Sequence, residues 1–223
     1  MATTGVIIVA GGTGTRMGSK IPKQFLMIRD KEVLVHTLEK FLASLAGIEI
    51  VIVLPQEHLM LWGSIAARHG LQGTHRVCAG GENRFMSVKN GLAALGPCDV
   101  IAVHDGVRPL LSEEMIKRCV DTAEKHGAAV PVVEPADSFR MIADGYPDIV
   151  DRTALRAVQT PQVFRGDIIR KAYDTDYSPR FTDDASVVEH SGVRLTFCEG
   201  EYRNIKITRP EDMLFAEAVI ASR

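Results

Sequence analysis

The sequence has no long apolar run and no strong excess of charge of either sign, and each shortage excludes a class of protein. The apolar stretch at residues 6–10 is too short for a signal-peptide core or a membrane span, and no other run approaches membrane-spanning length. The net charge of −2 provides no bulk attraction to nucleic acid or to an acidic membrane surface. We therefore expect a soluble protein that binds neither.

Cysteine is also scarce, and its placement argues against disulfides and zinc. Cys78, Cys98, Cys119 and Cys198 lie far apart in the sequence, without Cys-x-x-Cys or Cys/His spacing. This pattern favours reduced, mostly buried thiols, which are typical of the cytoplasm. The chain is long enough for one large core and short for two, so we expect residues 1–223 to form a single domain.

Buried strands alternate with amphipathic helices over the first part of the chain. Residues 5–10, 48–54 and 100–104 are continuous apolar, β-branched runs, which are typical of parallel strands covered on both faces. The fold class that this predicts is α/β, a Rossmann-like, three-layer arrangement with a mostly parallel sheet. The other elements expected in this part are helices near 34–45, 58–69, 83–95 and 113–126, and strands near 76–78 and 128–133.

Between residues 134 and 155 the alternation breaks. Two short strand-like segments, 138–142 and 148–152, are separated by the turn-forming pair Asp144-Gly145, which predicts a protruding β-hairpin arm. A hairpin that cannot bury both faces on its own domain is a natural dimerisation element, so we expect a homodimer formed through residues 134–155. An ordinary surface hairpin is the alternative.

The remaining chain returns to the α/β pattern. Helices are expected near residues 166–173 and 184–190, with a strand at 194–197. Thr208 to Glu211 has the spacing of a capping box, which predicts a terminal helix running to about residue 221.

The densest chemical signal follows the first strand. Residues 10–18, Ala-Gly-Gly-Thr-Gly-Thr-Arg-Met-Gly, are followed by Pro-Lys-Gln at 22–24. Glycines let backbone N–H groups approach phosphate oxygens where a Cβ would obstruct them, although an ordinary tight turn is the alternative for glycines alone. Arg16 and Lys23 add two cations, which suits a triphosphate whose charge must be neutralised during bond formation. The spacing matches neither a P-loop nor a dinucleotide fingerprint.

These residues resemble the signature of sugar-phosphate nucleotidyltransferases, and five later motifs narrow the resemblance to the 2-C-methyl-D-erythritol 4-phosphate cytidylyltransferase family. The resemblance implies a nucleotidyltransferase fold and transfer of the cytidylyl group of CTP to methylerythritol phosphate, with release of pyrophosphate, in non-mevalonate isoprenoid biosynthesis. The acceptor phosphate is already ionised at neutral pH, so positioning and charge stabilisation suffice. The motifs are His104-Asp-Gly-Val-Arg-Pro109, Val150-Asp-Arg152, Gln159-Thr-Pro-Gln162, Thr182-Asp-Asp-Ala-Ser186 and the segment 204–212, Asn-Ile-Lys-Ile-Thr-Arg-Pro-Glu-Asp.

The resemblance also implies roles for the charged residues. Arg16 and Lys23 would stabilise charge at the α-phosphate and on the departing pyrophosphate. Arg152 and Lys206 would hold the incoming sugar phosphate, with Arg152 supplied either by the same chain or by the arm of a partner subunit. Asp105 would lie near the ribose or bind Mg²⁺, the implied cofactor, because this hard cation prefers carboxylate and water ligands.

The nucleotide and the acceptor would each have a further set of contacts. Those implied for the nucleotide are Ala10, Gly11, Gly12, Gly14 and Thr15 in the first loop, and Gly80, Gly81 and Ser87 at the cytosine end. Those implied for the sugar phosphate are Arg108, Ser138 and Thr160. The chain departs from the usual family pattern at Ser138, where threonine is common, and at Asp184, where glutamate is common.

Two other functions stay open from the sequence. A ribitol 5-phosphate cytidylyltransferase would bind a similar polyol phosphate, and a few acceptor-side residues could decide between them. A non-catalytic nucleotide-binding module would need neither Arg16 nor Lys23. Among single residues, Asp105 and Arg108 could form a structural ion pair, and we expect His104 to be a hydrogen-bonded structural residue.

Overall fold

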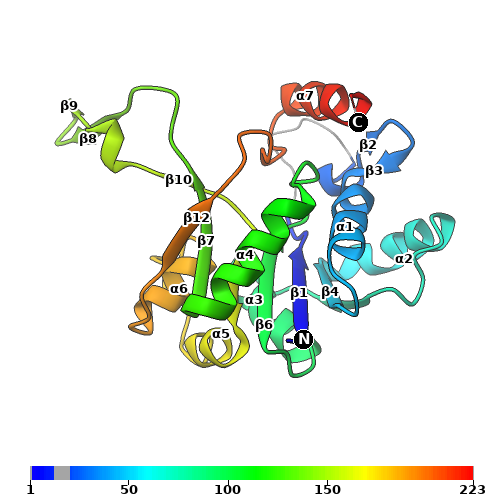
Figure 1. Ribbon diagram of the computed structural model, residues 1–223. Coiled ribbons are helices and arrows are strands. Elements are labelled where there is room, and N and C mark those ends of the chain that lie inside the picture. The colour runs from blue at the N-terminus through cyan, green and yellow to red at the C-terminus, as the bar shows by residue number, and fades with distance from the viewer. Residues whose placement is uncertain (1, 13–20, 223) are drawn as a thin grey trace.

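The computed structural model of the protein describes residues 2–12 and 21–222, and a twisted central sheet runs through its middle (Figure 1). The strands pair in the order β10-β7-β11-β6-β1-β4-β5, and β12 pairs with β7. β1, β4, β5 and β6 run parallel, while β11 is antiparallel to both of its neighbours. The strands are β1 (Thr4–Val9), β4 (Glu49–Leu54), β5 (Arg76–Ala79), β6 (Val100–Asp105), β7 (Ala128–Val133), β10 (Ala157–Val158), β11 (Gln162–Arg165) and β12 (Thr196–Glu199).

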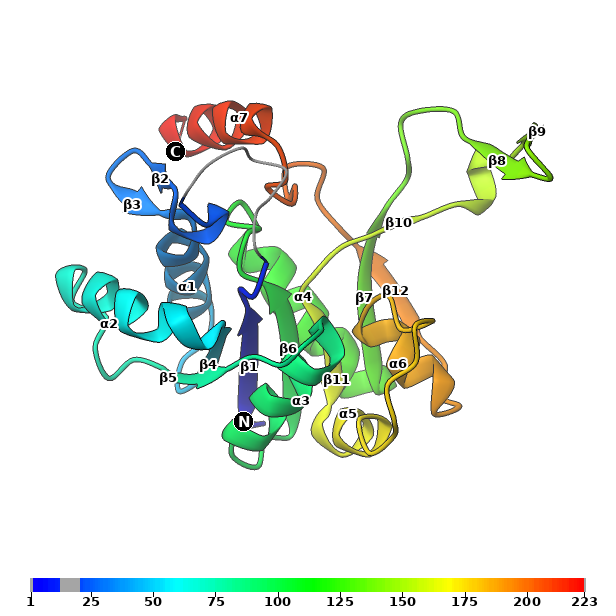
Figure 2. The same ribbon diagram turned by 180° about the vertical axis from the view of Figure 1, so that it is seen from behind.

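Helices cover both faces of this sheet. Ile7 and Ile8 of β1 are fully buried but belong to different cores, because successive side chains of a strand point to opposite faces. Figure 2 shows α3, α5 and α6 in front of the sheet, on the face opposite α1 and α4. The predicted three-layer α/β architecture is confirmed. The helices are α1 (Val33–Ser44), α2 (Leu59–Arg68), α3 (Arg84–Ala94), α4 (Glu113–His126), α5 (Gly166–Ala172) and α6 (Asp184–His190).

The chain changes direction at β1, and this creates the crevice that holds the site. It leaves β1 through α1 to reach β4 on one side, and it returns through α3 on the opposite face to reach β6 on the other side. At such a switch point, the loops after the strands diverge and leave space at the carboxyl edge of the sheet. Backbone hydrogen bonds keep these loops close to the strands, with Ala10 N donating to Val53 O at 2.9 Å and Gly106 N donating to Val9 O at 2.8 Å.

A smaller third core lies above this edge, where α7 (Pro210–Ala221) meets the short hairpin β2 (Met27–Ile28) and β3 (Lys31–Glu32). The predicted capping box at Thr208 and Glu211 is wrong by one residue. The carboxylate of Asp212 accepts hydrogen bonds from the backbone N–H groups of Thr208 and Arg209, at 2.7 and 2.8 Å. The reason is that Pro210 takes the first helical position, which makes Asp212 the third residue of the helix.

A hairpin arm, β8 (Arg140–Ala143) and β9 (Tyr146–Ile149), extends away from the body of the protein (Figures 1 and 2). Asp144 and Gly145 both have positive φ angles, 50° and 84°, as a tight two-residue hairpin turn requires. The predicted arm is therefore present, although its strands are shorter than expected. Several large apolar side chains on it are exposed, namely Phe139, Met141, Ile142, Tyr146 and Ile149.

Other expectations need small corrections. The strand predicted at 194–197 lies at Thr196–Glu199, and β11 was not predicted at all. Cys119 and Cys198 are distant in sequence, yet their Sγ atoms lie 3.5 Å apart, and all four cysteines are free thiols. Within residues 2–12 and 21–222, no helix is both long enough and apolar enough to cross a membrane.

Candidate active site

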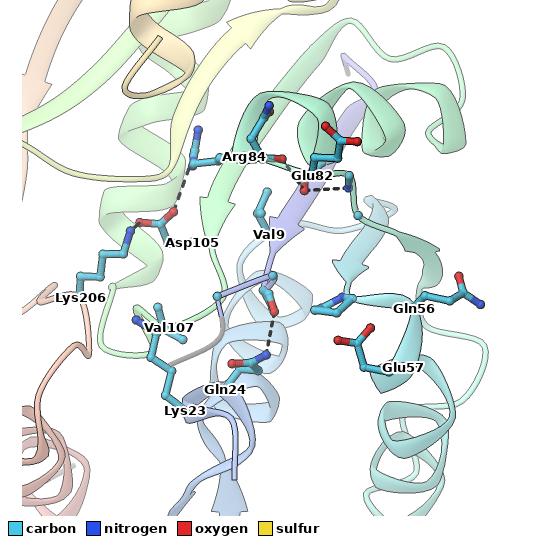
Figure 3. Close-up of a pocket in the computed structure, with 18 residues that line it drawn as sticks. Val9, Lys23, Gln24, Gln56, Glu57, Glu82, Arg84, Asp105, Val107 and Lys206 are labelled. Carbon is cyan, nitrogen blue, oxygen red and sulfur yellow. Dashed lines mark hydrogen bonds and ion pairs between the residues drawn. The ribbon is translucent and has the colours of Figure 1, made fainter. Parts of the chain in front are cut away.

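A cavity of about 580 Å³ opens at the carboxyl edge of the sheet, where the loops after β1, β4, β5 and β6 meet (Figure 3). Nine of the residues predicted for the site line it: Ala10, Gly11, Gly12, Lys23, Gly80, Gly81, Ser87, Asp105 and Lys206. The lining residues that were not predicted for the site are Val9, Gln24, Pro55, Gln56, Glu57, Glu82, Asn83, Arg84 and Val107. Gly14, Thr15 and Arg16 lie outside the described residues.

The glycine-lined wall is braced by two residues from the short 3-10 helix Lys23–Phe25. Gln24 is buried, and its Nε2 donates to the backbone oxygen of Ala10 at 2.8 Å. Lys23 lies against Gly12, since a Cβ added to that glycine would sit 3.6 Å from the lysine Cε. Its ammonium group donates to the backbone oxygen of Ile207 at 3.0 Å. The first loop, the lysine and the segment that carries Lys206 are thus held together.

The opposite wall is a glycine turn at the start of α3. Ser87 Oγ donates to the backbone oxygen of Asn83 at 2.8 Å and accepts from the N–H of Gly81 at 3.1 Å. A Cβ on Gly81 would overlap with Met86, so glycine is needed there. The hydroxyl of Ser87 therefore holds the shape of the turn, which leaves its remaining lone pair for a ligand.

Asp105, at the end of β6, is the centre of a cluster of positive charges. Its Oδ2 lies 3.0 Å from Lys206 Nζ and 3.3 Å from Arg108 Nε, and its Oδ1 lies 3.6 Å from Arg84. Figure 3 shows the carboxylate between Arg84 and Lys206. Burial would raise the pKa of Asp105, but the three cations outweigh burial and hold that pKa well below its usual range. The group is thus a carboxylate at any physiological pH.

Arg84 is the main site residue that the sequence did not indicate. It is the first residue of α3, and its NH2 group donates to Asp184 Oδ2 at 2.6 Å and lies 3.6 Å from Asp105 Oδ1. Asp184 is fully buried, and its Oδ1 accepts from the hydroxyl of Tyr173 at 2.7 Å. The glycine pair before Arg84 indicated a turn near the site. The sequence does not show that Arg84 pairs with Asp184, which is 100 residues away.

Arg108 and Thr160 lie behind Asp105 and do not line the cavity. Thr160 Oγ1 accepts from the backbone N–H of Asp105 at 3.1 Å and lies 3.0 Å from His104 Nδ1, while His104 Nε2 lies 3.2 Å from the backbone oxygen of Arg108. A consistent assignment has the threonine donating to Nδ1 and Nε2–H donating to the carbonyl. Burial lowers the pKa of His104 to about 3, so the ring is neutral and structural, as predicted.

Asn204 extends this network to the segment that carries Lys206. It is fully buried, and its Nδ2 donates to the backbone oxygen of Thr160 at 2.9 Å. Its own backbone oxygen accepts from Arg108 NH1 at 2.8 Å. The end of β6, the loop at Thr160 and the loop before α7 are therefore fixed relative to one another.

Ser138 and Arg152 are not brought to this cavity by their own chain. Both lie on the exposed arm, and Arg152 NH1 donates to the backbone oxygen of Ala136 at 2.8 Å. Arg152 instead lines a smaller cavity of about 230 Å³ beside Tyr202. The structure thus separates these two predicted residues from Lys206.

The described residues contain no group of three or more His, Cys, Asp or Glu side chains arranged to hold a metal. Asp105 is the buried carboxylate that faces the cavity next to its basic end. One carboxylate fits Mg²⁺ bound mainly by substrate phosphates and water, which is the usual arrangement for this ion, and does not fit an all-protein metal site.

Comparisons with known proteins agree over nearly the whole chain. A family model described as 2-C-methyl-D-erythritol 4-phosphate cytidylyltransferase matches residues 4–222. A protein with that name from Bacteroides thetaiotaomicron is 47% identical over 215 residues, covering 96% of this chain and 98% of its own. Another from Porphyromonas gingivalis is 43% identical over 217 residues, covering 97% of each chain.

Solved structures agree in fold. The crystal structure of 4-diphosphocytidyl-2C-methyl-D-erythritol synthase from Anaerococcus prevotii superposes with a TM-score of 0.84 at 29% identity over 99% of both chains. The 2-C-methyl-D-erythritol 4-phosphate cytidylyltransferase of Francisella tularensis gives a TM-score of 0.82 at 28% identity, covering 98% of this chain and all of its own.

Proposed function

This chain belongs to the 2-C-methyl-D-erythritol 4-phosphate cytidylyltransferase family, and we propose that the cavity at the carboxyl edge of its sheet is the active site. The enzyme transfers the cytidylyl group of CTP to methylerythritol phosphate in isoprenoid biosynthesis. The observation that carries our assignment of the site is the presence of a glycine-lined wall and of Lys23, Arg84 and Lys206 around one cavity. A nucleoside triphosphate needs both features.

The charges of the cavity set the orientation of the nucleotide. Figure 3 shows Gln56 and Glu57 at one side, and Asp105 and Lys206 at the other. The polar, acidic side offers acceptors for the exocyclic amine of cytosine, next to the turn at Gly80–Gly81, while the basic side suits the phosphates. We place the triphosphate along Ala10, Gly11 and Gly12, and we propose Gly14 and Thr15 of the same sequence motif as further contacts.

Catalysis then consists of positioning and charge stabilisation. A phosphate oxygen of the acceptor attacks the α-phosphorus, a new phosphorus–oxygen bond forms, and the bond to the leaving pyrophosphate breaks. Arg16 and Lys23 stabilise the charge that develops on the α-phosphate and on pyrophosphate, and Lys206 aligns the acceptor phosphate. The hydrogen bond from Lys23 to Ile207 supports this, because it sets the two lysines on adjoining parts of one wall.

Magnesium is the cofactor that we propose, carried to the site by the triphosphate; Asp105 would hold it through bound water and would contact the ribose directly. Bound there, the ion would neutralise phosphate charge. The protein itself keeps Asp105 charged and fixed in place. Its three cationic neighbours keep the carboxylate ionised, and the hydrogen bond from its backbone N–H to Thr160 holds its position.

The acceptor site is completed by a second subunit in our proposal. Ser138 and Arg152 lie on the arm, away from Lys206 of their own chain, so a partner's arm is a direct way to bring equivalent groups to the cavity. The exposed apolar side chains of the arm, among them Ile142 and Ile149, support its use as a homodimer interface. Arg108 and Thr160 serve the acceptor side from behind, by fixing the loop that carries Lys206. Four free thiols are in keeping with a cytoplasmic enzyme.

Pyrophosphate release tests the proposal. Purified protein is mixed with CTP, Mg²⁺ and either methylerythritol phosphate or ribitol 5-phosphate, and pyrophosphate is measured. Release with methylerythritol phosphate alone supports the assignment, release with ribitol phosphate alone contradicts the acceptor, and no release with either contradicts an enzymatic function. Lys23→Met and Arg16→Met should each lower kcat at least about 100-fold if the site is correctly placed.

A further inference from the structure

Arg84 forms the middle of a line of contacts that crosses four elements and ends in the cavity. The line begins at the hydroxyl of Tyr173, next to α5, and passes through Asp184 at the start of α6 to Arg84 at the start of α3. It ends 3.6 Å further on, at Oδ1 of Asp105, where β6 ends. Because Asp184 is completely buried and both of its oxygens accept hydrogen bonds, the inner end of the line is fixed.

The two oxygens of Asp105 are paired with different cations. Lys206 and Arg108 approach Oδ2, whereas Arg84 approaches Oδ1. The side chain of Lys206 is 41% exposed, so it is able to turn toward an arriving phosphate. Arg84 does not have this freedom, because the same nitrogen that faces Asp105 donates a hydrogen bond to Asp184. Arginine suits this position since its planar fork can bind two carboxylates at once, which a lysine ammonium does less well.

A substrate phosphate that draws Lys206 away would therefore leave Asp105 with two fixed partners, Arg108 at Oδ2 and Arg84 at Oδ1. Without Arg84, Oδ1 of this buried carboxylate would have no cation beside it, and the group would turn away or lose its alignment. Arg84 is placed to prevent this throughout binding. Figure 3 shows its side chain and that of Lys206 approaching Asp105 from two different sides.

We propose that Arg84 is a positioning residue for nucleotide recognition: anchored by Asp184, it keeps the carboxylate of Asp105 aimed at the ribose of CTP while Lys206 engages the acceptor phosphate. This inference rests on the proposed function. It predicts that the loss of Arg84 or Asp184 weakens the binding of CTP and leaves the binding of the acceptor nearly unchanged.

The experiment compares wild type with Arg84→Met, Arg84→Lys, Asp184→Asn and the double variant of Arg84→Met with Asp184→Asn. Steady-state kinetics are measured with CTP, with its 2′-deoxy and 3′-deoxy analogues, and with methylerythritol phosphate. The matched control is Arg170→Met. Arg170 is also partly buried, and its guanidinium donates to the backbone oxygens of Leu92, Leu95 and Gly96 at the far end of α3, away from the cavity.

We expect Arg84→Met to raise KM for CTP about tenfold or more, with less than about a threefold change in KM for the acceptor. Its preference for CTP over a deoxy analogue should fall by a similar factor, because the ribose contact is lost. Asp184→Asn should show the same pattern, the double variant should be no worse than Arg84→Met, and Arg84→Lys should recover part of the loss. Arg170→Met should lower Tm while leaving the preference unchanged.

Two results would overturn the inference. One is an Arg84→Met enzyme with wild-type KM for CTP and wild-type ribose preference. The other is an equal rise in KM for both substrates that tracks the loss of Tm, as in Arg170→Met, because that would make Arg84 a structural residue. If the proposed function itself is wrong, the result is different, because the wild-type protein then releases no pyrophosphate from CTP and methylerythritol phosphate.

Discussion

The ammonium group of Lys23 donates a hydrogen bond to the backbone oxygen of Ile207, 184 residues further along the chain, at a distance of 3.0 Å. This contact joins the wall that begins with the glycine loop to the segment that carries Lys206. The two lysines serve different reactants in our assignment, one the triphosphate and the other the acceptor. This hydrogen bond couples the two segments, so a shift of either one strains the contact with the other.

Removal of Lys206 tests the acceptor half of this arrangement. We expect Lys206→Met to lower kcat/KM for methylerythritol phosphate about 100-fold, because a charge-assisted contact to the acceptor phosphate is lost. KM for CTP should change much less. Steady-state kinetics with each substrate varied in turn provide the measurement. Lys117→Met is the control, since Lys117 is an exposed lysine on α4 that faces Glu113. A similar loss in both variants would show that the effect comes from net charge alone.

Thr160 provides a test of the network behind the site. Its hydroxyl serves both the backbone N–H of Asp105 and the ring of His104. Thr160→Val keeps the size and removes both hydrogen bonds, so we expect the free energy of unfolding to fall by about 1–3 kcal/mol. Denaturant titration measures this, and Thr160→Ser, which retains the hydroxyl, should lose much less. Equal losses in the two variants would mean that the methyl group and not the hydroxyl matters.

The central strands of the sheet could be predicted from the sequence, whereas β11 could not. The runs that became β1, β4 and β6 are apolar on both faces, which is the usual pattern of strands in a covered parallel sheet, so the central layer was predictable. β11 was missed because it is only four residues long and begins with Gln162, a polar residue. That glutamine is buried since it bonds to the side chain of Asp183 and the backbone of Ala185, which local sequence cannot show.

The candidate site likewise contains residues that could be predicted from the sequence and residues that could not. Gly11, Gly12 and Lys23 belong to one short motif, so their meeting could be predicted from local chemistry. The pairing of Arg84 with Asp184 depends on two helices that meet only in the folded chain, and the role of Thr160 behind Asp105 depends on neighbouring strands. Sequence reasoning found the residues that carry motifs and missed those whose importance comes from a distant partner.

The buried histidine makes a prediction about pH. Burial lowers the pKa of His104 to about 3, whereas the unfolded chain has the ordinary value of about 6.5. Between these values the unfolded state binds a proton that the folded state does not, so stability falls as pH falls below about 6.5. From pH 7.5 to 5.5, wild type should lose about 1.4 kcal/mol more than His104→Gln. Unfolding titrations of metal-free protein at both pH values measure this, and parallel pH dependences would contradict it.

Our proposal that Arg152 reaches the acceptor site from a partner subunit can be tested directly. In the folded chain this residue lies on the arm and bonds to Ala136, apart from Lys206. If the arm of one subunit completes the site of the other, Arg152→Met and Lys206→Met disable a homodimer through different subunits.

Mixing the two inactive variants under conditions that exchange subunits should then restore activity. In a hybrid dimer, one site carries both substitutions and the other site carries neither. With random exchange half of the dimers are hybrids, so about a quarter of wild-type activity should return. If Arg152 instead serves its own chain, every site in the hybrid lacks one of the two cations, and the mixture stays as inactive as its components. Size-exclusion chromatography with light scattering confirms that the species assayed is a dimer, and a monomeric wild type would contradict the shared site directly.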